Sequence, residues 1–227
     1  MNAISKPLWQ PTPEQVASAS ITRFTQEVES QWGRTFGDYR ALHDWSVEQP
    51  EEFWISVWDF CGILAVTRGN RVLERLSTVP GARFFPDARL NFARNLLQRR
   101  DEGLAICFRS EDRVERSLTY VELYLQVAEI ARGLQNVGIK PGDRVCAYMP
   151  NMPETVIAML ATTAIGAVWS SCSPDFGVQG VLDRFGQIEP RILFSADGYY
   201  YNGKQHDSLA KLAEIREGLP SVEQVVV

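Results

Sequence analysis

Apolar and aromatic residues recur at helical spacing through the first hundred residues of the chain. Four of them lie three or four positions apart before Gly33: Ile21, Phe24, Val28 and Trp32. Thr12-Pro13-Glu14-Gln15 is a capping-box sequence, and Ser46-Val47-Glu48-Gln49 repeats that signature before an aromatic run that ends at Gly62. Residues 1–100 are therefore predicted to form a helical segment, and we interpret its aromatic stripe as core or interface instead of a ligand cage.

The second half of the chain alternates apolar strands with amphipathic helices. Residues 104–108 and 113–118 are expected to form a hairpin. The next helix begins with Thr119 as N-cap and Glu122 at its third position. Four strands with three intervening helices follow: strands 144–149, 167–172, 191–196 and 222–227, and helices 151–165, 178–188 and 207–217, the first capped by Asn151 and the last by Asp207. This order predicts an α/β fold over residues 101–227, with a parallel sheet covered on both faces.

The composition is that of a globular protein without nucleic-acid-binding character. Of the 227 residues, 45% are hydrophobic and 22% are charged, close to the average of soluble domains. The 28 acidic residues outnumber the 23 basic ones and give a net charge of −5, whereas nucleic-acid-binding domains are usually strongly basic. No apolar signal core follows Met1, and the longest apolar stretch, 156–169, is shorter than the roughly 20 residues that span a bilayer. We therefore expect a cytoplasmic protein without a membrane anchor.

The four cysteines are far apart, with spacings of 46, 39 and 26 residues: Cys61, Cys107, Cys146 and Cys172. The sequence holds two histidines and no C-x-x-C pair, so a zinc site is not expected and no metal ligand is assigned. Each cysteine lies in an apolar or small-residue stretch, which predicts buried free thiols; disulfides are the alternative.

One segment matches the first seven places of a Walker A loop, G-x-x-x-x-G-K, and extends from Gly198 to Lys204. The next residue is Gln205, where a P-loop has the Ser or Thr that binds magnesium. Three consecutive tyrosines also replace the small residues that let backbone amides surround a phosphate. We therefore do not interpret this segment as a phosphate loop.

A series of segments resembles the adenylate-forming acyl-CoA synthetases in order and spacing: Leu118–Leu123, Gly138–Val145, Tyr148–Glu154 and Ala164–Ser170. Ser170–Gly177 and Tyr201–Lys204 resemble the acetoacetyl-CoA synthetase group of this family more than the acetyl-CoA synthetase group. Nearer the amino terminus, Tyr39–Phe60 is similar to the helical cap of the acetyl-CoA synthetase group, and Phe85–Ala93 to the segment that follows this cap. The resemblance covers nearly the whole chain.

The resemblance implies a helical N-terminal cap over residues 1–100 and the first part of the AMP-binding α/β domain over residues 101–227. Enzymes of this kind activate a carboxylate with ATP and Mg²⁺ to an acyl-adenylate, and then transfer the acyl group to CoA. The implied substrate is acetoacetate or a similar short acid. Alternatives are another short-chain or aryl acyl-CoA synthetase, and a catalytically dead binding or dimerisation module.

The resemblance also implies that the 227 residues do not catalyse this reaction alone. They contain neither the Gly-rich phosphate loop ending in Lys nor the later motifs of the family, so no catalytic residue is assigned and no cofactor is expected to bind tightly. The sequence stops in an apolar strand, Val222–Val227, without a covering helix. We therefore expect that further sequence follows, and that the isolated chain self-associates through this edge.

By resemblance, three residues belong to a CoA channel: Asp175, Tyr201 and Lys204. Lys204 aligns with a position that is usually Arg and holds the 3′-phosphate of CoA; otherwise it is an ordinary solvated lysine. The loop Ser173–Gly177 connects a strand to a helix, a common place for ligand contacts in parallel sheets. The sequence leaves open whether this loop is only a turn or a wall of the channel.

Overall fold

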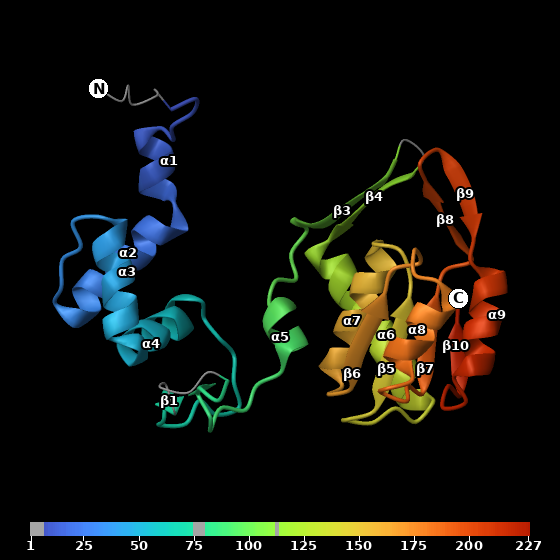
Figure 1. The fold of residues 1–227 in the computed structure, drawn as a ribbon. Helices are drawn as coiled ribbons and strands as arrows, with labels where there is room; N and C mark the ends of the chain where they lie inside the picture. Colours follow the sequence, from blue (N-terminus) through green and yellow to red (C-terminus); the bar gives the residue numbers. More distant parts are fainter. Residues whose placement is uncertain (1–6, 75–79, 112–113) are drawn as a thin grey trace. The chain divides into compact units, whose positions relative to one another are not determined.

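The computed structural model of the chain describes residues 7–74, 80–111 and 114–227 (Figure 1). It divides into two compact units, Met1–Leu90 and Asn91–Val227. Asp112 of the predicted hairpin turn and Arg113, the first residue of the predicted second strand, lie outside the described residues. The boundary between residues 100 and 101 inferred from the sequence stays a prediction.

The first unit is mainly helical. Its elements are α1 (Pro13–Ser18), α2 (Ser20–Trp32), α3 (Tyr39–Glu48), α4 (Pro50–Phe60), β1 (Leu73–Glu74) and β2 (Arg83–Phe84). The capping box at Thr12 and Gln15 is confirmed. The helical spacing of Ile21, Phe24, Val28 and Trp32 belongs to α2, which is separate from the capped helix α1 because Ala19 adopts an extended conformation between them. At this break the Val16 carbonyl accepts two hydrogen bonds, one from the Ala19 amide at 3.2 Å and one from the Thr22 hydroxyl at 2.6 Å.

The predicted N-cap at Ser46 is also wrong. Ser46 lies inside α3, and its hydroxyl donates to the His43 carbonyl at 2.6 Å. The next helix begins at Pro50, and Gln49 leaves the helical region with φ −125°. Proline at a first helical position has no N–H to lose, but it forces the preceding residue out of the α conformation. The break therefore depends on Pro50 and not on a side-chain cap.

The aromatic stripe of the first unit forms a core, as predicted. Its buried members are Phe24, Val28, Leu42 and Trp45, with Trp32, Phe36, Phe53, Val57 and Phe60 packed against them. The Trp32 indole donates to the Ser56 hydroxyl at 2.8 Å, and the Trp45 indole donates to the Glu52 carboxylate at 3.0 Å. These bonds satisfy two N–H groups that burial would otherwise leave without water.

The second unit is the predicted α/β fold. Its elements are α5 (Phe92–Leu96), β3 (Leu104–Ser110), β4 (Val114–Thr119), α6 (Tyr120–Asn136), β5 (Arg144–Tyr148), α7 (Pro153–Ala164), β6 (Val168–Cys172), α8 (Val178–Phe185), β7 (Ile192–Ser195), β8 (Gly198–Tyr201), β9 (Lys204–Asp207), α9 (Leu209–Gly218) and β10 (Gln224–Val226). One sheet has the order β10-β7-β5-β6, and all its pairs are parallel. The two hairpins, β3–β4 and β8–β9, are separate antiparallel ribbons.

Helices cover both faces of this sheet. Alternate residues of β5 divide between two cores, because successive side chains of a strand point to opposite faces. Val145 and Ala147 pack with α6 and α7, whereas Cys146 and Tyr148 pack with α8 and α9. All four are at most 1% exposed, which explains why residues 145–148 carry no charged side chain.

Helix starts in this unit are only partly as predicted. Thr119 and Glu122 form the expected capping box at the start of α6. Met152 takes the N-cap position of α7 in place of Asn151, without a side-chain cap, because Pro153 begins the helix. The N-cap of α9 is Ser208 and not Asp207. The Asp207 carboxylate nevertheless accepts a 2.7 Å hydrogen bond from the amide of Leu209, the first residue of the helix.

The prediction of four buried thiols is correct for Cys146 and Cys172 and wrong for Cys61 and Cys107, which are exposed. Cys61 immediately follows α4, and Cys107 lies on a two-stranded ribbon with one open face. Apolar neighbours in sequence do not determine which face a side chain takes. All four cysteines are free, and no described helix is both long and apolar enough to cross a membrane.

Arg191 ties together three segments at the amino-terminal edge of the sheet. Its guanidinium donates to the Asp143 carboxylate at 2.7 Å, to the Glu223 carboxylate through two 2.7 Å bonds, and to the Gly138 carbonyl at 3.0 Å. A backbone hydrogen bond from Lys140 and the bond from Arg191 lower the pKa of Asp143, and Arg191 lowers the pKa of Glu223. The network holds the starts of β7 and β10 together.

We expect the stability that Arg191 contributes to depend on pH. Because the folded pKa values of both carboxyls lie below their ordinary values of 3.8 and 4.5, the contribution is complete above those values and is lost as pH falls below them. Arg191→Met should therefore lower the melting temperature at pH 7 and have progressively less effect in acid. Arg191→Lys is the matched control, since it keeps the charge but not the two-pronged bond. A melting difference between wild type and Arg191→Met that stays constant to pH 2.5 would contradict this.

Candidate functional site

A cavity of about 840 Å³ lies at the carboxyl-terminal edge of the parallel sheet. Its walls come from the segments that follow β5, β6 and β7, and from the two hairpins that extend beyond that edge (Figure 1). Parallel strands place their carboxyl ends on one side of a sheet, so loops distant in sequence meet there. This edge is therefore the candidate functional site.

The loop after β6 is held from below by Tyr148, the last residue of β5. The Tyr148 hydroxyl lies 2.7 Å from the Pro174 carbonyl and 3.0 Å from the Phe176 carbonyl. Burial raises the pKa of this phenol, so it stays a neutral donor. The side chain of the central strand thus fixes the path of the loop in which Asp175 lies.

Asp175 points toward the cavity with two hydroxyl partners. The Ser173 hydroxyl donates to one carboxylate oxygen at 2.9 Å, and the Tyr199 hydroxyl donates to the other at 3.3 Å. Burial and the negative charge of Asp175 both raise the pKa of Tyr199, burial being the larger cause. The carboxylate thereby links the loop after β6 to the hairpin β8–β9.

The hairpin β8–β9 presents an aromatic face to the cavity. Tyr199 stacks on His206 with ring centroids 5.0 Å apart and planes 16° from parallel, and Tyr201 lies 6.4 Å from the same imidazole. Among the described residues, Nε2 of His206 is buried without a hydrogen-bond partner. The face is therefore a flat aromatic surface that carries one unsatisfied polar atom.

The turn of this hairpin is Asn202-Gly203, with φ 52° and 70°. Positive φ at both central residues is the condition for the two-residue turn that joins twisted strands, and Asn-Gly is its strongest sequence signal. The segment that matches a Walker A loop is thus a strand–turn–strand unit, and it does not lead into a helix as a P-loop does. Rejecting the phosphate-loop interpretation was correct, but the hairpin itself was not predicted.

The structure brings together two of the three predicted site residues and places the third beside them. Asp175 and Tyr201 both line the cavity. Lys204 pairs with Tyr201 across the hairpin but is not among the lining residues; it is exposed, and its side chain has no ion pair with a described residue. Their roles toward CoA stay predictions.

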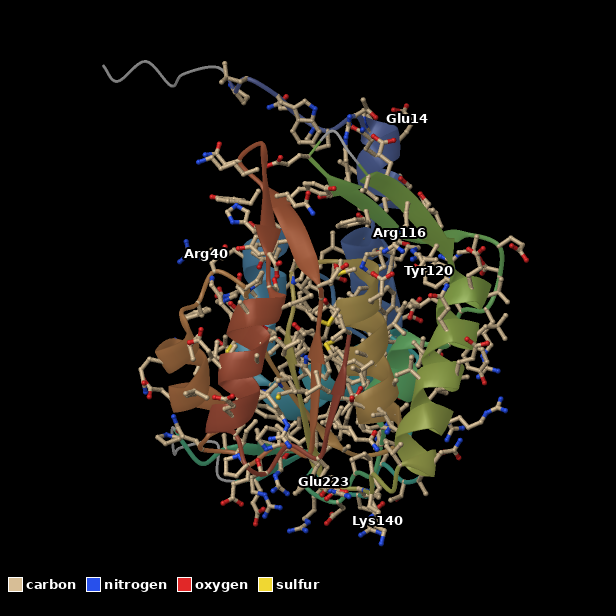
Figure 2. All side chains as sticks on the ribbon, turned by 90° about the vertical axis from the view of Figure 1, so that its right-hand side faces the viewer. Glu14, Arg40, Arg116, Tyr120, Lys140 and Glu223 are labelled. Atoms are coloured by element: carbon tan, nitrogen blue, oxygen red, sulfur yellow. The ribbon has the colours of Figure 1, made fainter. Side chains whose placement is uncertain are left out.

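Three other residues at this edge were not predicted: Glu111, Arg116 and His206. Arg116 on β4 donates to the Glu154 carboxylate of α7 at 2.7 Å and anchors the hairpin β3–β4 to the sheet layer. Figure 2 shows Arg116 at the end of the unit that carries the hairpins, and Lys140 and Glu223 at the opposite end. The Asn-Gly dipeptide could have indicated the hairpin that carries His206; no sequence signal pointed to Glu111.

Comparison with known proteins gives concordant matches. The AMP-binding enzyme family matches residues 93–227, and the family described as the acetyl-coenzyme A synthetase N-terminus matches residues 39–96. The acetoacetyl-coenzyme A synthetase of Rhizobium meliloti is 46% identical over 97% of this chain and 34% of its own length. The acetoacetyl-CoA synthetase of Danio rerio is 42% identical over 98% of this chain and 33% of its own.

A solved structure shows the same fold. The acetoacetyl-CoA synthetase from Streptomyces lividans superposes with a TM-score of 0.90 at 44% identity, over 97% of this chain and 34% of that one. The chain thus spans about a third of the length of the relatives that it matches. The resemblance stated from the sequence motifs is confirmed. Since the family match extends over more than half of its residues, the chain belongs to the AMP-binding enzyme family.

Proposed function

We propose that this chain is the amino-terminal part of an ATP-dependent acetoacetate–CoA ligase. The observation that carries this proposal is the similarity to acetoacetyl-CoA synthetases over 97% of the chain, at 46% identity in sequence and with a TM-score of 0.90 in structure. In such a ligase the acid first displaces pyrophosphate from ATP to give an acyl-adenylate. The CoA thiol then displaces AMP and forms the thioester.

The cavity at the sheet edge is proposed as part of the path of CoA. The residues fit this group in three respects: a cavity of about 840 Å³, an aromatic face formed by Tyr199 and Tyr201, and the exposed Lys204 at the tip of the same hairpin. Lys204 would hold the 3′-phosphate as a point charge. Tyr201 and Asp175 would form the wall beside the nucleotide.

The described residues do not fit the ATP–Mg²⁺ part of the reaction. They hold no group of three acidic, histidine or cysteine side chains arranged as metal ligands. The 227 residues also contain no Ser/Thr/Gly-rich loop that ends in lysine. We therefore assign adenylation to the parts of the relatives that lie beyond the matched third.

A chimera tests this proposal. The chain is joined to the remaining two thirds of the Rhizobium meliloti relative, and acetoacetate-dependent exchange of labelled pyrophosphate into ATP is measured together with thioester formation. We expect activity with acetoacetate to exceed that with acetate or butyrate. The 227-residue chain alone is the control and should exchange no pyrophosphate above a no-enzyme background. A folded chimera that activates acetate but not acetoacetate would refute the substrate assignment.

A further inference from the structure

A hydrogen bond between described residues joins the tips of the two hairpins. The Gly203 amide at the turn of β8–β9 donates to the Glu111 carboxylate at the end of β3–β4, at 3.1 Å from one oxygen and 3.4 Å from the other. The two residues are 92 positions apart in the sequence. Figure 1 shows these two hairpin ends meeting above the sheet edge. The contact thus spans the rim of the cavity.

Both partners are held in conformations that aim them at each other. Glu111 has φ 44°, which only a few per cent of residues other than glycine adopt, and Gly203 has φ 70°. The strand pairing of this hairpin ends at Tyr201 and Lys204, so the Gly203 amide lies outside the ladder. The Gly203 amide is therefore available to donate to an anion, and in this structure the anion is the Glu111 carboxylate.

A positive charge follows this donor directly. Lys204 is the next residue, it is exposed, and it makes no ion pair with any described residue. A backbone N–H beside an unpaired ammonium group is a combination that recognises phosphate. The carboxylate of Glu111 therefore occupies the backbone donor of this combination from within the chain.

We propose that Glu111 is an internal substitute for phosphate, which closes the hairpin tips in the ligand-free state and is displaced by the 3′-phosphate of CoA. This inference rests on the proposed CoA path and adds to it a residue that sets specificity. A ligand without a 3′-phosphate has no group to replace the carboxylate, so it leaves the contact intact. A ligand with the phosphate must first break it, and loses affinity by doing so.

Removal of the charge should therefore favour CoA selectively. In Glu111→Gln, the amide oxygen is a weaker acceptor and no longer repels phosphate near Lys204. We expect CoA to bind about two- to fivefold more tightly, within the range that one nearby charge produces at a solvent-exposed site. Dephospho-CoA should bind equally to both proteins.

The experiment is an NMR titration of the 227-residue chain with CoA and with dephospho-CoA, following the Gly203 amide and the dissociation constants. Glu115→Gln is the matched control, because Glu115 is an exposed glutamate of the same hairpin whose partner is Arg109 at 3.0 Å. Before ligand is added, Glu111→Gln should accelerate hydrogen exchange at the Gly203 amide, and Glu115→Gln should not. CoA should move the Gly203 amide resonance in the wild-type chain, and dephospho-CoA should not.

Three results would overturn the inference. Unchanged Gly203 exchange in Glu111→Gln would show that the contact does not hold in solution. Weaker CoA binding in Glu111→Gln would show that Glu111 supports the ligand and is not displaced by it. If CoA binds no better than dephospho-CoA to wild type and to Lys204→Ala alike, the proposed CoA path fails and displacement fails with it. Faster Gly203 exchange in Glu111→Gln would then still show that the hairpin contact exists.

Discussion

Replacing Phe185 by alanine is expected to lower the free energy of unfolding of the second unit by about 3 to 5 kcal/mol. Phe185 ends α8, has 0% exposure, and packs among Val181, Ile215 and Leu219 between the sheet and α9. Removing its ring leaves a cavity that the surrounding helices cannot fill without leaving the sheet. Protein cores are packed closely enough that such a void costs more than the lost transfer energy alone.

Urea unfolding followed by hydrogen exchange at the amides of β5 and β7 measures this loss in the second unit alone. Phe176→Ala is the matched control, because it makes the same chemical change at a side chain that is 38% exposed. The Arg184 guanidinium lies 4.2 Å from the centroid of the partly exposed Phe176 ring, and a loss of less than about 1 kcal/mol is expected. Equal losses in the two variants would mean that α8 does not pack against the sheet as described.

The parallel sheet was predictable because its strands carry an unambiguous signal. Residues 145–148 are apolar without alternation, and the structure buries side chains on both faces of β5. The helices between the strands show helical periodicity, and strand–helix–strand order permits few arrangements. Pattern and burial agree in residues 145–148 of β5 and in β7, whose side chains are all buried.

The helix ends were less predictable, because proline and competing hydrogen bonds decide them. Ser46 and Asn151 belong to sequences that look like caps, yet Pro50 and Pro153 determine where the helices begin. The break at Ala19 has no glycine or proline to mark it. Proline therefore sets two of these helix starts in place of the expected side-chain caps.

The candidate site was predicted only where parallel strands determine the geometry. Asp175 follows β6, and the hairpin with Tyr201 follows β7, so both arrive at the same edge of the sheet. Glu111 reaches that edge on a ribbon that is not part of the sheet. Its contact with Gly203 depends on the lengths and twist of two separate hairpins, which no local pattern encodes.

Lys204→Ala is expected to raise the KM for CoA about ten- to a hundredfold in the chimera, while pyrophosphate exchange stays unchanged. A hydrogen bond between a charged donor and phosphate contributes roughly 1.5–3 kcal/mol, which corresponds to that range. Exchange should be unaffected because the adenylate forms before the CoA thiol attacks. Dephospho-CoA lacks the group that Lys204 would hold, so its KM should hardly respond to the substitution.

Lys140→Ala is the control for a general effect of charge, because Lys140 is another exposed lysine of the same unit and lies at the opposite end of it (Figure 2). Lys140→Ala should leave the KM for CoA and the KM for dephospho-CoA unchanged. Equal increases with CoA and dephospho-CoA in Lys204→Ala would instead show that Lys204 supports the hairpin or another part of the nucleotide. A selective loss would place the 3′-phosphate at the tip of β8–β9, beside the amide that Glu111 occupies in the ligand-free chain. Lys204 would then favour CoA over dephospho-CoA, and the displacement of Glu111 would reduce that preference.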